Sequence, residues 1–283
     1  MVRSSAIAHF GAVLFVSFAS LTDAQIIPRP CIGAPPTHGP CVELGLDCSG
    51  SSDLDPSQCA AWQEFFDSTN GHGWRTAINS RSDPCNIHGN HGLASVASYC
   101  IGPNLVSLDL SDNGLKGTLP DSIGELKGLQ FLVLSNNNEP LGGRNSAKAL
   151  HGSIPESIGN LTELQVLDLG GSDWLTGTIP KVIGNLQKLK TLRLYHNRLH
   201  GHIPPELGSL AHLNNLYLYN NLLWGRVPPL NFTHIRYCGI GDAKGANDGN
   251  VFCTPLPKGA RKCNLEGGIK TKGTCPPNHT LAA

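Results

Sequence analysis

The chain has 283 residues, of which 40% are hydrophobic, and it carries 21 basic and 21 acidic residues. This length fits one or two ordinary domains, and the hydrophobic fraction is large enough for a core. The even charge balance lacks the basic stripe that a nucleic-acid partner would require. The content of leucine, isoleucine and valine argues against a disordered chain.

The first 24 residues have the pattern of a secretory signal peptide. Arg3 supplies positive charge, an apolar stretch is densest at 11–19, and Thr22 and Ala24 fit the −3 and −1 positions of a cleavage site. A transmembrane anchor is the alternative, but the apolar run is too short and is interrupted by Ser and His. No later stretch is long and apolar enough to span a bilayer. We therefore expect a secreted, extracellular protein that does not span a membrane.

The cysteines and the glycosylation motifs agree with secretion. Residues 25–58 form a Pro- and Cys-rich extension, and Cys31, Cys41, Cys48 and Cys59 allow three pairings between which the sequence does not choose. The remaining cysteines are expected to form disulfides in an oxidising compartment: Cys85, Cys100, Cys238, Cys253, Cys263 and Cys275. Three Asn-x-Ser/Thr motifs predict a glycoprotein modified at Asn160, Asn231 and Asn278.

A helix is expected within an N-terminal cap that ends at residue 104. Asp55 before a proline can cap this helix, with Gln58 three residues on as the second member of a capping box. Asn70-Gly71 ends it. One face of the helix carries the aromatic residues suited to cover a slice of core: Trp62, Phe65 and Phe66. We place the cap at 59–104.

A repeat occupies residues 105–232. Five segments start with the pattern LxxLxL, at Leu105, Leu129, Leu164, Leu189 and Leu213. The starts are 24, 35, 25 and 24 residues apart, so the period is constant once an eleven-residue insertion at 139–149 is removed. A fixed period in this range is the signature of a solenoid.

Each repeat has an internal logic. The leucines of LxxLxL point inward from a short strand, and stacked strands form a parallel sheet. An asparagine then follows, which we expect to point inward and to hydrogen-bond the backbone of the turn. A glycine permits the next bend, and an Ile-Pro pair ends strand pairing. The asparagines concerned are Asn113, Asn137, Asn197 and Asn221.

The pattern LxxLxLxxNxLxGxIPxxIGxL resembles the plant-type extracellular leucine-rich repeat. Polygalacturonase-inhibiting proteins and the short ectodomains of plant receptor kinases have a similar layout. The resemblance implies an α/β solenoid: a right-handed superhelix with a parallel sheet on its concave face and disulfide-stabilised caps. It also implies that Cys85 pairs with Cys100, and it identifies residues 233–264 as a C-terminal Cys-rich cap before a tail at 265–283.

The residues between the inward leucines would form a readable grid on the concave face. Repeats four and five carry a group of aromatic and polar residues there, which is the composition of a binding hot spot. Cross-strand stacking that only stiffens the sheet is the alternative. The residues expected to bind a ligand are Arg193, Tyr195, His196, Tyr217, Tyr219, Asn220 and, at one rim, Trp174.

The insertion leaves repeat two just after Asn137 and rejoins it at Leu150, so it projects from one rim without breaking the repeat. The next repeat has one extra residue and Trp174 at the same turn. Two hypotheses follow: the insertion shields Trp174, or the two together grip a ligand held against the concave face.

Two features suggest chemistry without completing a site. Cys85, His88 and His91 have spacings that a metal can use, but no further ligands complete a structural zinc site. Asp109 and Asp168 share an outward column, where we expect two solvated acids whose pKa nothing raises. We therefore expect no enzyme, no metal and no cofactor.

The sequence favours a secreted recognition module that binds a protein or peptide ligand through its concave face. Inhibition of a hydrolase and a part in cell-surface signalling or defence are the forms we consider. The alternative is a structural protein of the cell wall or matrix that binds polysaccharide. No sequence feature identifies the ligand.

Overall fold

The computed structural model describes residues 54–76, 81–86, 97–137, 149–241, 249–263 and 270–274. The chain divides into two compact units, Met1–Pro40 and Cys41–Ala283, and every described residue belongs to the second. The expected signal peptide, most of the Cys-rich extension and the C-terminal tail beyond residue 274 lie outside these residues. No helix in the described part of the chain is long and apolar enough to cross a membrane.

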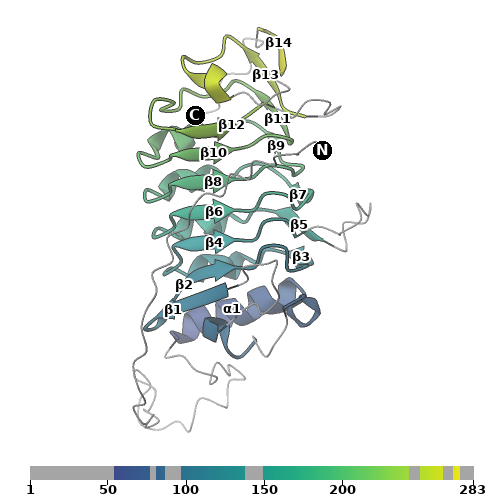
Figure 1. Ribbon diagram of the computed structural model, residues 1–283, viewed down its shortest axis with the longest axis vertical. Helices are drawn as coiled ribbons and strands as arrows, with labels where there is room; N and C mark the ends of the chain where they lie inside the picture. Colours follow the sequence, from purple (N-terminus) through teal and green to yellow (C-terminus); the bar gives the residue numbers. More distant parts are fainter. Residues whose placement is uncertain are drawn as a thin grey trace, which may run out of the picture. The chain divides into compact units, whose positions relative to one another are not determined.

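A seven-stranded sheet runs through the whole stack of repeats (Figure 1). Its order is β1 (Ala97–Ile101), β2 (Asn104–Asp109), β4 (Phe131–Val133), β6 (Val166–Asp168), β8 (Thr191–Arg193), β10 (Asn215–Tyr217) and β12 (Tyr237–Gly239). All neighbours pair in parallel except β1 and β2, which form an antiparallel hairpin. The central leucine of each repeat faces that of the next across the strands, for example Leu132 beside Leu167. The solenoid predicted from the period is therefore confirmed, whereas its right-handed winding stays a prediction.

The other side of each repeat has its own regular elements. Short strands at the glycine bend and in the C-terminal cap form two further sheets: β3 (Gly117–Thr118), β5 (Leu150–Ser153) and β7 (Trp174–Thr176); and β9 (His200–Gly201), β11 (Leu222–Gly225), β13 (Val251–Thr254) and β14 (Lys270–Thr274). A one-turn 3-10 helix follows the proline in each of four repeats: η4 (Asp121–Glu125), η6 (Glu156–Asn160), η7 (Lys181–Asn185) and η8 (Pro205–Ser209). The isoleucine or leucine inside each of these helices is buried, as the IGNL motif predicts. The repeat pattern did not predict these two additional sheets.

The glycine between these two sets of strands is required for a steric reason. Gly117 has φ of 103°, and a Cβ placed there would lie 2.0 Å from the carbonyl oxygen of Ser68. Only a residue without a side chain satisfies both constraints at once. The same left-handed glycine recurs once per repeat, which explains the LxG motif.

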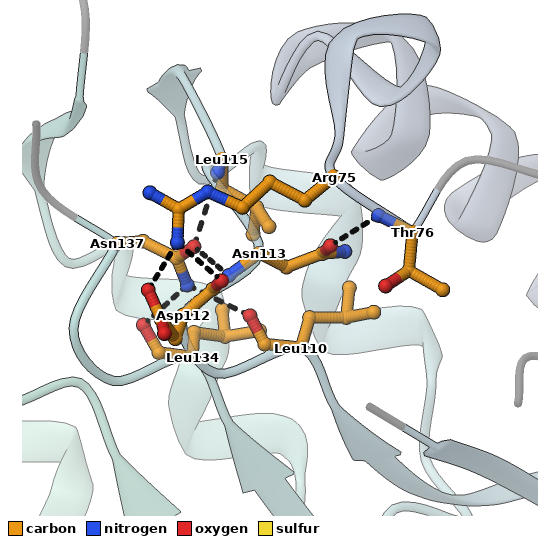
Figure 2. A network of polar contacts seen from close by, with 8 residues as sticks. All are labelled: Arg75, Thr76, Leu110, Asp112, Asn113, Leu115, Leu134 and Asn137. Atoms are coloured by element: carbon orange, nitrogen blue, oxygen red, sulfur yellow. Dashed lines mark hydrogen bonds and ion pairs between the residues drawn. The ribbon is translucent and has the colours of Figure 1, made fainter. Parts of the chain in front are cut away.

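Buried asparagines satisfy the backbone of the turn after each strand. Asn137 accepts hydrogen bonds at Oδ1 from the N–H groups of Asn113 and Leu115, at 3.0 Å each, and donates from Nδ2 to the carbonyls of Leu110 and Leu134, at 2.9 Å each. These bonds connect two consecutive repeats, as Figure 2 shows. The predicted role of the asparagine is therefore confirmed. Asn197 and Asn221 make corresponding bonds between their own repeats.

The asparagine ladder is interrupted in repeat three. Ser172 occupies the expected place there; it is fully buried, and its hydroxyl has no hydrogen-bond partner among the described residues. An asparagine at this place in repeat three would accept a hydrogen bond from the backbone N–H of Leu150 in repeat two. That N–H donates instead to the carbonyl of Asn137 at 3.2 Å. The two ends of the insertion therefore close on each other and replace the missing side-chain bond.

The N-terminal cap is built on α1 (Pro56–Ser68), whose Trp62, Phe65 and Phe66 are buried against the first repeat. Asp55 caps the helix by accepting from the N–H of Ser57 at 2.8 Å. The predicted capping box is wrong. The amide of Gln58 instead donates to Asn104 at 2.6 Å and accepts from the N–H of Leu105 at 3.0 Å, because those groups at the start of β2 need partners.

The cap is also joined to the ladder downstream of the helix (Figure 2). The N–H of Thr76 donates to Oδ1 of Asn113 at 2.7 Å, and Arg75 pairs with the carboxylate of Asp112. α1 begins at Pro56, directly after its capping residue Asp55, as the sequence predicts, and Leu54 is part of the core. The helix and its capping residue therefore belong to one structural unit.

Disulfides hold both caps. Cys85 in η3 (Pro84–Asn86) is bonded to Cys100 in β1, and Cys238 in β12 is bonded to Cys263 in η9 (Ala260–Cys263). Cys59 and Cys253 are also disulfide-bonded. A further asparagine that the sequence analysis missed continues the ladder into the C-terminal cap. Asn250 donates to the carbonyls of Leu218 and Ile240 and accepts from the N–H of Leu223.

Replacing one ladder asparagine should destabilise the whole stack. We expect Asn221→Ala to lower the free energy of unfolding by about 2–4 kcal/mol, because buried carbonyl and N–H groups of two repeats lose their partners. The exposed Asn185 provides the control, and its replacement by Ala should cost less than about 0.5 kcal/mol. Urea unfolding followed by circular dichroism measures both. Equal effects of the two substitutions would contradict the ladder.

Candidate functional site

The candidate site lies on the face of the seven-stranded sheet that points away from the core, at β8 and β10. In the register of the sheet, Asp168, Arg193 and Tyr217 are direct neighbours on β6, β8 and β10. Each follows a buried leucine and precedes another, so the alternation of the strand turns it outward. Tyr195 and Tyr219 stand two positions further along the chain, where their strands have just ended.

The aromatic rings are in contact with one another. Tyr195 and Tyr219 stack with ring centroids 5.1 Å apart and an interplanar angle of 13°. Tyr217 meets Tyr219 edge-on at 6.2 Å, and the guanidinium of Arg193 lies 5.8 Å from the centre of the Tyr217 ring. The sequence-predicted residues of repeats four and five therefore form one continuous group, which we call the tyrosine cluster: Arg193, Tyr195, His196, Tyr217, Tyr219 and Asn220.

Gly170 in repeat three makes room for the cluster. A Cβ at this position would lie 2.4 Å from the ring of Tyr195, so that ring packs directly over the glycine. Burial raises the pKa of Tyr195 to about 12, with the nearby Asp168 carboxylate as a smaller cause, and burial also raises the pKa of Tyr219. Both phenols therefore keep their protons in neutral and acidic solution and can donate hydrogen bonds.

Asp168 was expected to be a solvated acid, and that expectation is wrong. Its side chain is buried beneath the cluster, where it accepts hydrogen bonds from the N–H of Gly170 and from Nη1 of Arg193, both at 3.1 Å. Burial raises the pKa of this carboxyl group, although the two hydrogen bonds oppose the shift. Tertiary packing produced this environment, because Arg193 and the tyrosines of the following repeats cover the acid.

His196 and Asn220 lie at the end of the cluster, in the left-handed backbone conformation, with φ of 48° and 53°. The amide of Asn220 is 3.0 Å from Nε2 of His196, and the imidazole meets the ring of Tyr219 edge-on at 5.4 Å. The turns after β8 and β10 thus hold both side chains beside the tyrosines. All six members of the cluster come from two adjacent repeats.

Comparisons with known proteins agree with this architecture. The family pattern described as the leucine rich repeat matches residues 104–126 and 188–210. Receptor like protein 21 of Arabidopsis thaliana is 58% identical over 36 residues, which make up 13% of this chain and 4% of that protein. The crystal structure of PEPR1–AtPEP1 aligns with a TM-score of 0.52 and 29% identity, covering 73% of this chain and 26% of that one.

The ectodomain of the receptor kinase SOBIR1 from Arabidopsis thaliana shares the fold, with a TM-score of 0.53, 24% identity, and coverage of 80% of this chain and all of that one. Two segments of this chain match the leucine-rich repeat, and the chain shares the fold of leucine-rich-repeat ectodomains. Its solenoid of repeats aligns with the structures of PEPR1–AtPEP1 and of the SOBIR1 ectodomain. It spans only a small part of receptor like protein 21 and about a quarter of PEPR1.

Trp174 lies apart from the tyrosine cluster in this leucine-rich-repeat fold. It begins β7 of the three-stranded sheet, where it pairs with His151 of β5. The guanidinium of Arg198 lies 3.8 Å from the centre of its ring, a cation–π contact that the sequence analysis missed. The bulk of the insertion, residues 138–148, is outside the described residues, so the shielding and gripping hypotheses both stay predictions.

The described residues near the cluster provide binding groups rather than a reaction centre. The one buried carboxylate is neutralised by Arg193 and hydrogen-bonded to backbone, which leaves it poorly placed to accept a proton from a substrate. Cys85 of the considered metal motif is in a disulfide, whereas His88 and His91 lie outside the described residues. The tyrosines, Arg193 and His196 can donate and accept hydrogen bonds and present aromatic surface.

The raised pKa of Asp168 predicts a specific pH dependence. The folded state binds this proton more tightly than the unfolded state. The buried charge therefore lowers the free energy of unfolding above the folded-state pKa, and this loss disappears as pH falls toward 3.8. The unfolding free energy of the wild type minus that of Asp168→Asn should therefore rise as pH is lowered from 7 to 4. Denaturation at several pH values measures it, and a constant or falling difference would falsify the assignment.

Proposed function

We propose that this chain is an extracellular recognition module that binds a protein or peptide ligand through the tyrosine cluster. The observation that carries the proposal is the gathering of three tyrosines, an arginine and a histidine into one partly exposed group on β8 and β10. Tyrosine and arginine are the residues that most often dominate binding energy at interfaces. Inhibition of a hydrolase and a part in signalling or defence are both compatible with such a module.

The geometry of the rings favours a protein or peptide over a polysaccharide at this site. A sugar ring packs against the flat face of an aromatic side chain. Tyr195 has one face against Tyr219 and packs over Gly170, so its flat surface is largely occupied. The edges and hydroxyl groups of the rings remain to meet a ligand, and these suit the amide groups of a polypeptide. Cross-strand stacking also stiffens the surface, which lowers the entropy lost on binding.

Replacing two tyrosines tests the proposal. Peptides are first selected from a display library on immobilised wild-type protein, and their affinity for Tyr217→Ala/Tyr219→Ala is then measured by calorimetry. We expect Kd to rise by about thirtyfold or more, because hot-spot residues contribute at least 2 kcal/mol each. The thermal unfolding curve verifies that the variant folds.

The control variant lies on the same sheet face near the N-terminal cap. Tyr99 on β1 and Phe131 on β4 are exposed by 57% and 39%, so Tyr99→Ala/Phe131→Ala removes similar aromatic surface away from the cluster. The selected peptides should bind this variant within about threefold of wild type. Undiminished binding to the tyrosine variant refutes the proposal. A glycan array that yields ligands where the peptide library yields none favours the polysaccharide alternative.

Secretion makes a separate prediction about glycosylation. The side chains of Asn160 at the end of η6 and Asn231 after η8 are exposed, so glycans at both sites can be accommodated on the folded chain. Asn278 lies outside the described residues. When the chain is expressed through a eukaryotic secretory pathway, Asn160→Gln and Asn231→Gln should each remove one glycan, seen as a mass shift. Secretion of an unmodified chain contradicts this prediction.

A further inference from the structure

Charge is distributed unevenly along the chain although its total is zero. Residues 223–283 contain eight lysines and arginines and three acids, a formal charge of +5, whereas residues 1–222 carry −5. The positive part coincides with the last repeat turn and the C-terminal cap, drawn in yellow-green and yellow in Figure 1. The three acids are Asp242, Asp248 and Glu266, which fall outside the described residues. The described residues of the cap contain no acid.

The cations occupy elements that are tied to one another. Arg236 precedes β12 and Arg261 lies in η9, and the Cys238–Cys263 disulfide joins these two elements. On the other side of the cap, Gly225 and Thr271 both pair with Phe252 of β13. The residues that follow them, Arg226 and Lys272, therefore belong to the segments on either side of β13.

These cations have no structural use that the described part of the chain reveals. All are exposed, and none forms an ion pair with a described residue: Arg226, Arg236, Lys258, Arg261 and Lys272. Lys262 differs, since its ammonium group donates to the carbonyl of Ile235 at 2.6 Å. Like charges kept together on a disulfide-held cap repel one another, and an anionic partner would offset that repulsion.

An exposed indole lies on the same sheet as one of these cations, Lys272. Trp224 of β11 is 41% exposed, and its ring centre is 4.1 Å from that of His202. Trp224 pairs with Val251 of β13, and Lys272 belongs to β14, the strand on the other side of β13. Leu222, also on β11, is 43% exposed. Aromatic surface beside cations is suited to a sugar ring that bears a carboxylate, because the ring packs on the indole while the acid pairs with lysine or arginine.

From the charge distribution and this indole we infer that the C-terminal cap is a second binding surface, which takes a carboxylate-bearing polysaccharide. This surface, which we call the basic cap, is separate from the tyrosine cluster and would hold the module on an acidic matrix while the cluster remains open. An anionic membrane would also attract the cations. However, peripheral membrane binding relies on a broad apolar face, and the large apolar side chains that the described cap exposes are divided between two sheets: Leu222 and Trp224 on β11, and Tyr237 on β12.

Affinity electrophoresis in gels that contain polygalacturonic acid tests the inference on the full chain. The wild type should be retarded at low salt, and retardation should weaken as salt rises because exposed charges are screened. The variant Arg226→Gln/Arg236→Gln/Arg261→Gln/Lys272→Gln should bind at least about tenfold more weakly. Trp224→Ala should weaken binding without changing its dependence on salt, since it removes only the packing contribution.

A matched variant separates the basic cap from net charge. Lys127→Gln/Lys181→Gln/Lys188→Gln/Lys190→Gln removes four exposed cations from the repeats and changes the total charge equally. This variant should be retarded as strongly as the wild type. Neither the wild type nor this variant should be retarded by the fully methyl-esterified polymer, which keeps the sugar rings but lacks the carboxylate charge.

Three results overturn the inference. The cap variant is retarded as strongly as the wild type; the cap variant and the variant of the repeats lose retardation equally; or the wild type binds phosphatidylserine vesicles but is not retarded by the polymer. The cap variant should bind the selected peptides normally, so this result does not depend on the tyrosine cluster.

Discussion

The hydrogen bonds of the buried asparagines, which four of the five repeats carry, are the interaction on which the rest of the structure depends. A chain that turns immediately after a three-residue strand must bury backbone N–H and C=O groups that no strand or helix pairs. The side chain of Asn137 has two acceptor positions and two donors, and it uses all four to join the turns of two repeats. Asn197, Asn221 and Asn250 likewise donate to carbonyls of two successive turns, and each accepts from one N–H group. Each repeat is thereby held at one spacing and one register relative to the next.

The fixed register is what creates the candidate site. Residues about one repeat apart in sequence become direct neighbours, so Asp168, Arg193 and Tyr217 form a row although each comes from a different repeat. Stacking then alters their properties. Tyr195 covers Gly170, Arg193 covers Asp168, and the acid becomes a buried partner instead of a surface charge. A grid of ordinary surface residues thus becomes one stiff aromatic group with a fixed cation.

The ladder also tolerates irregularity where another hydrogen bond replaces the lost one. Ser172 cannot reach the turn of repeat two, and the bond from Leu150 to Asn137 closes that turn at the base of the insertion. Arg198 lies over Trp174 in the turn one repeat further on. The C-terminal end is different, because Asn250 and two disulfide-bonded elements finish the ladder and leave the cations on the outside. The two proposed binding surfaces therefore follow from two different constraints: the register of the sheet and the closure of its end.

The repeat, its period, the inward leucines and asparagines, and the residues of the tyrosine cluster could all be predicted from the sequence alone. Each of these follows from local spacing, because a residue at a fixed place in a repeat has a fixed direction in the stack. The sequence also indicated the disulfide-bonded ends and the capping role of Asp55. Only the tertiary structure decided the partner of Gln58, the burial of Asp168, the cation–π contact of Arg198 and the role of Asn250. These depend on which side chain of a neighbouring element arrives in the same space, and no period within one repeat specifies that.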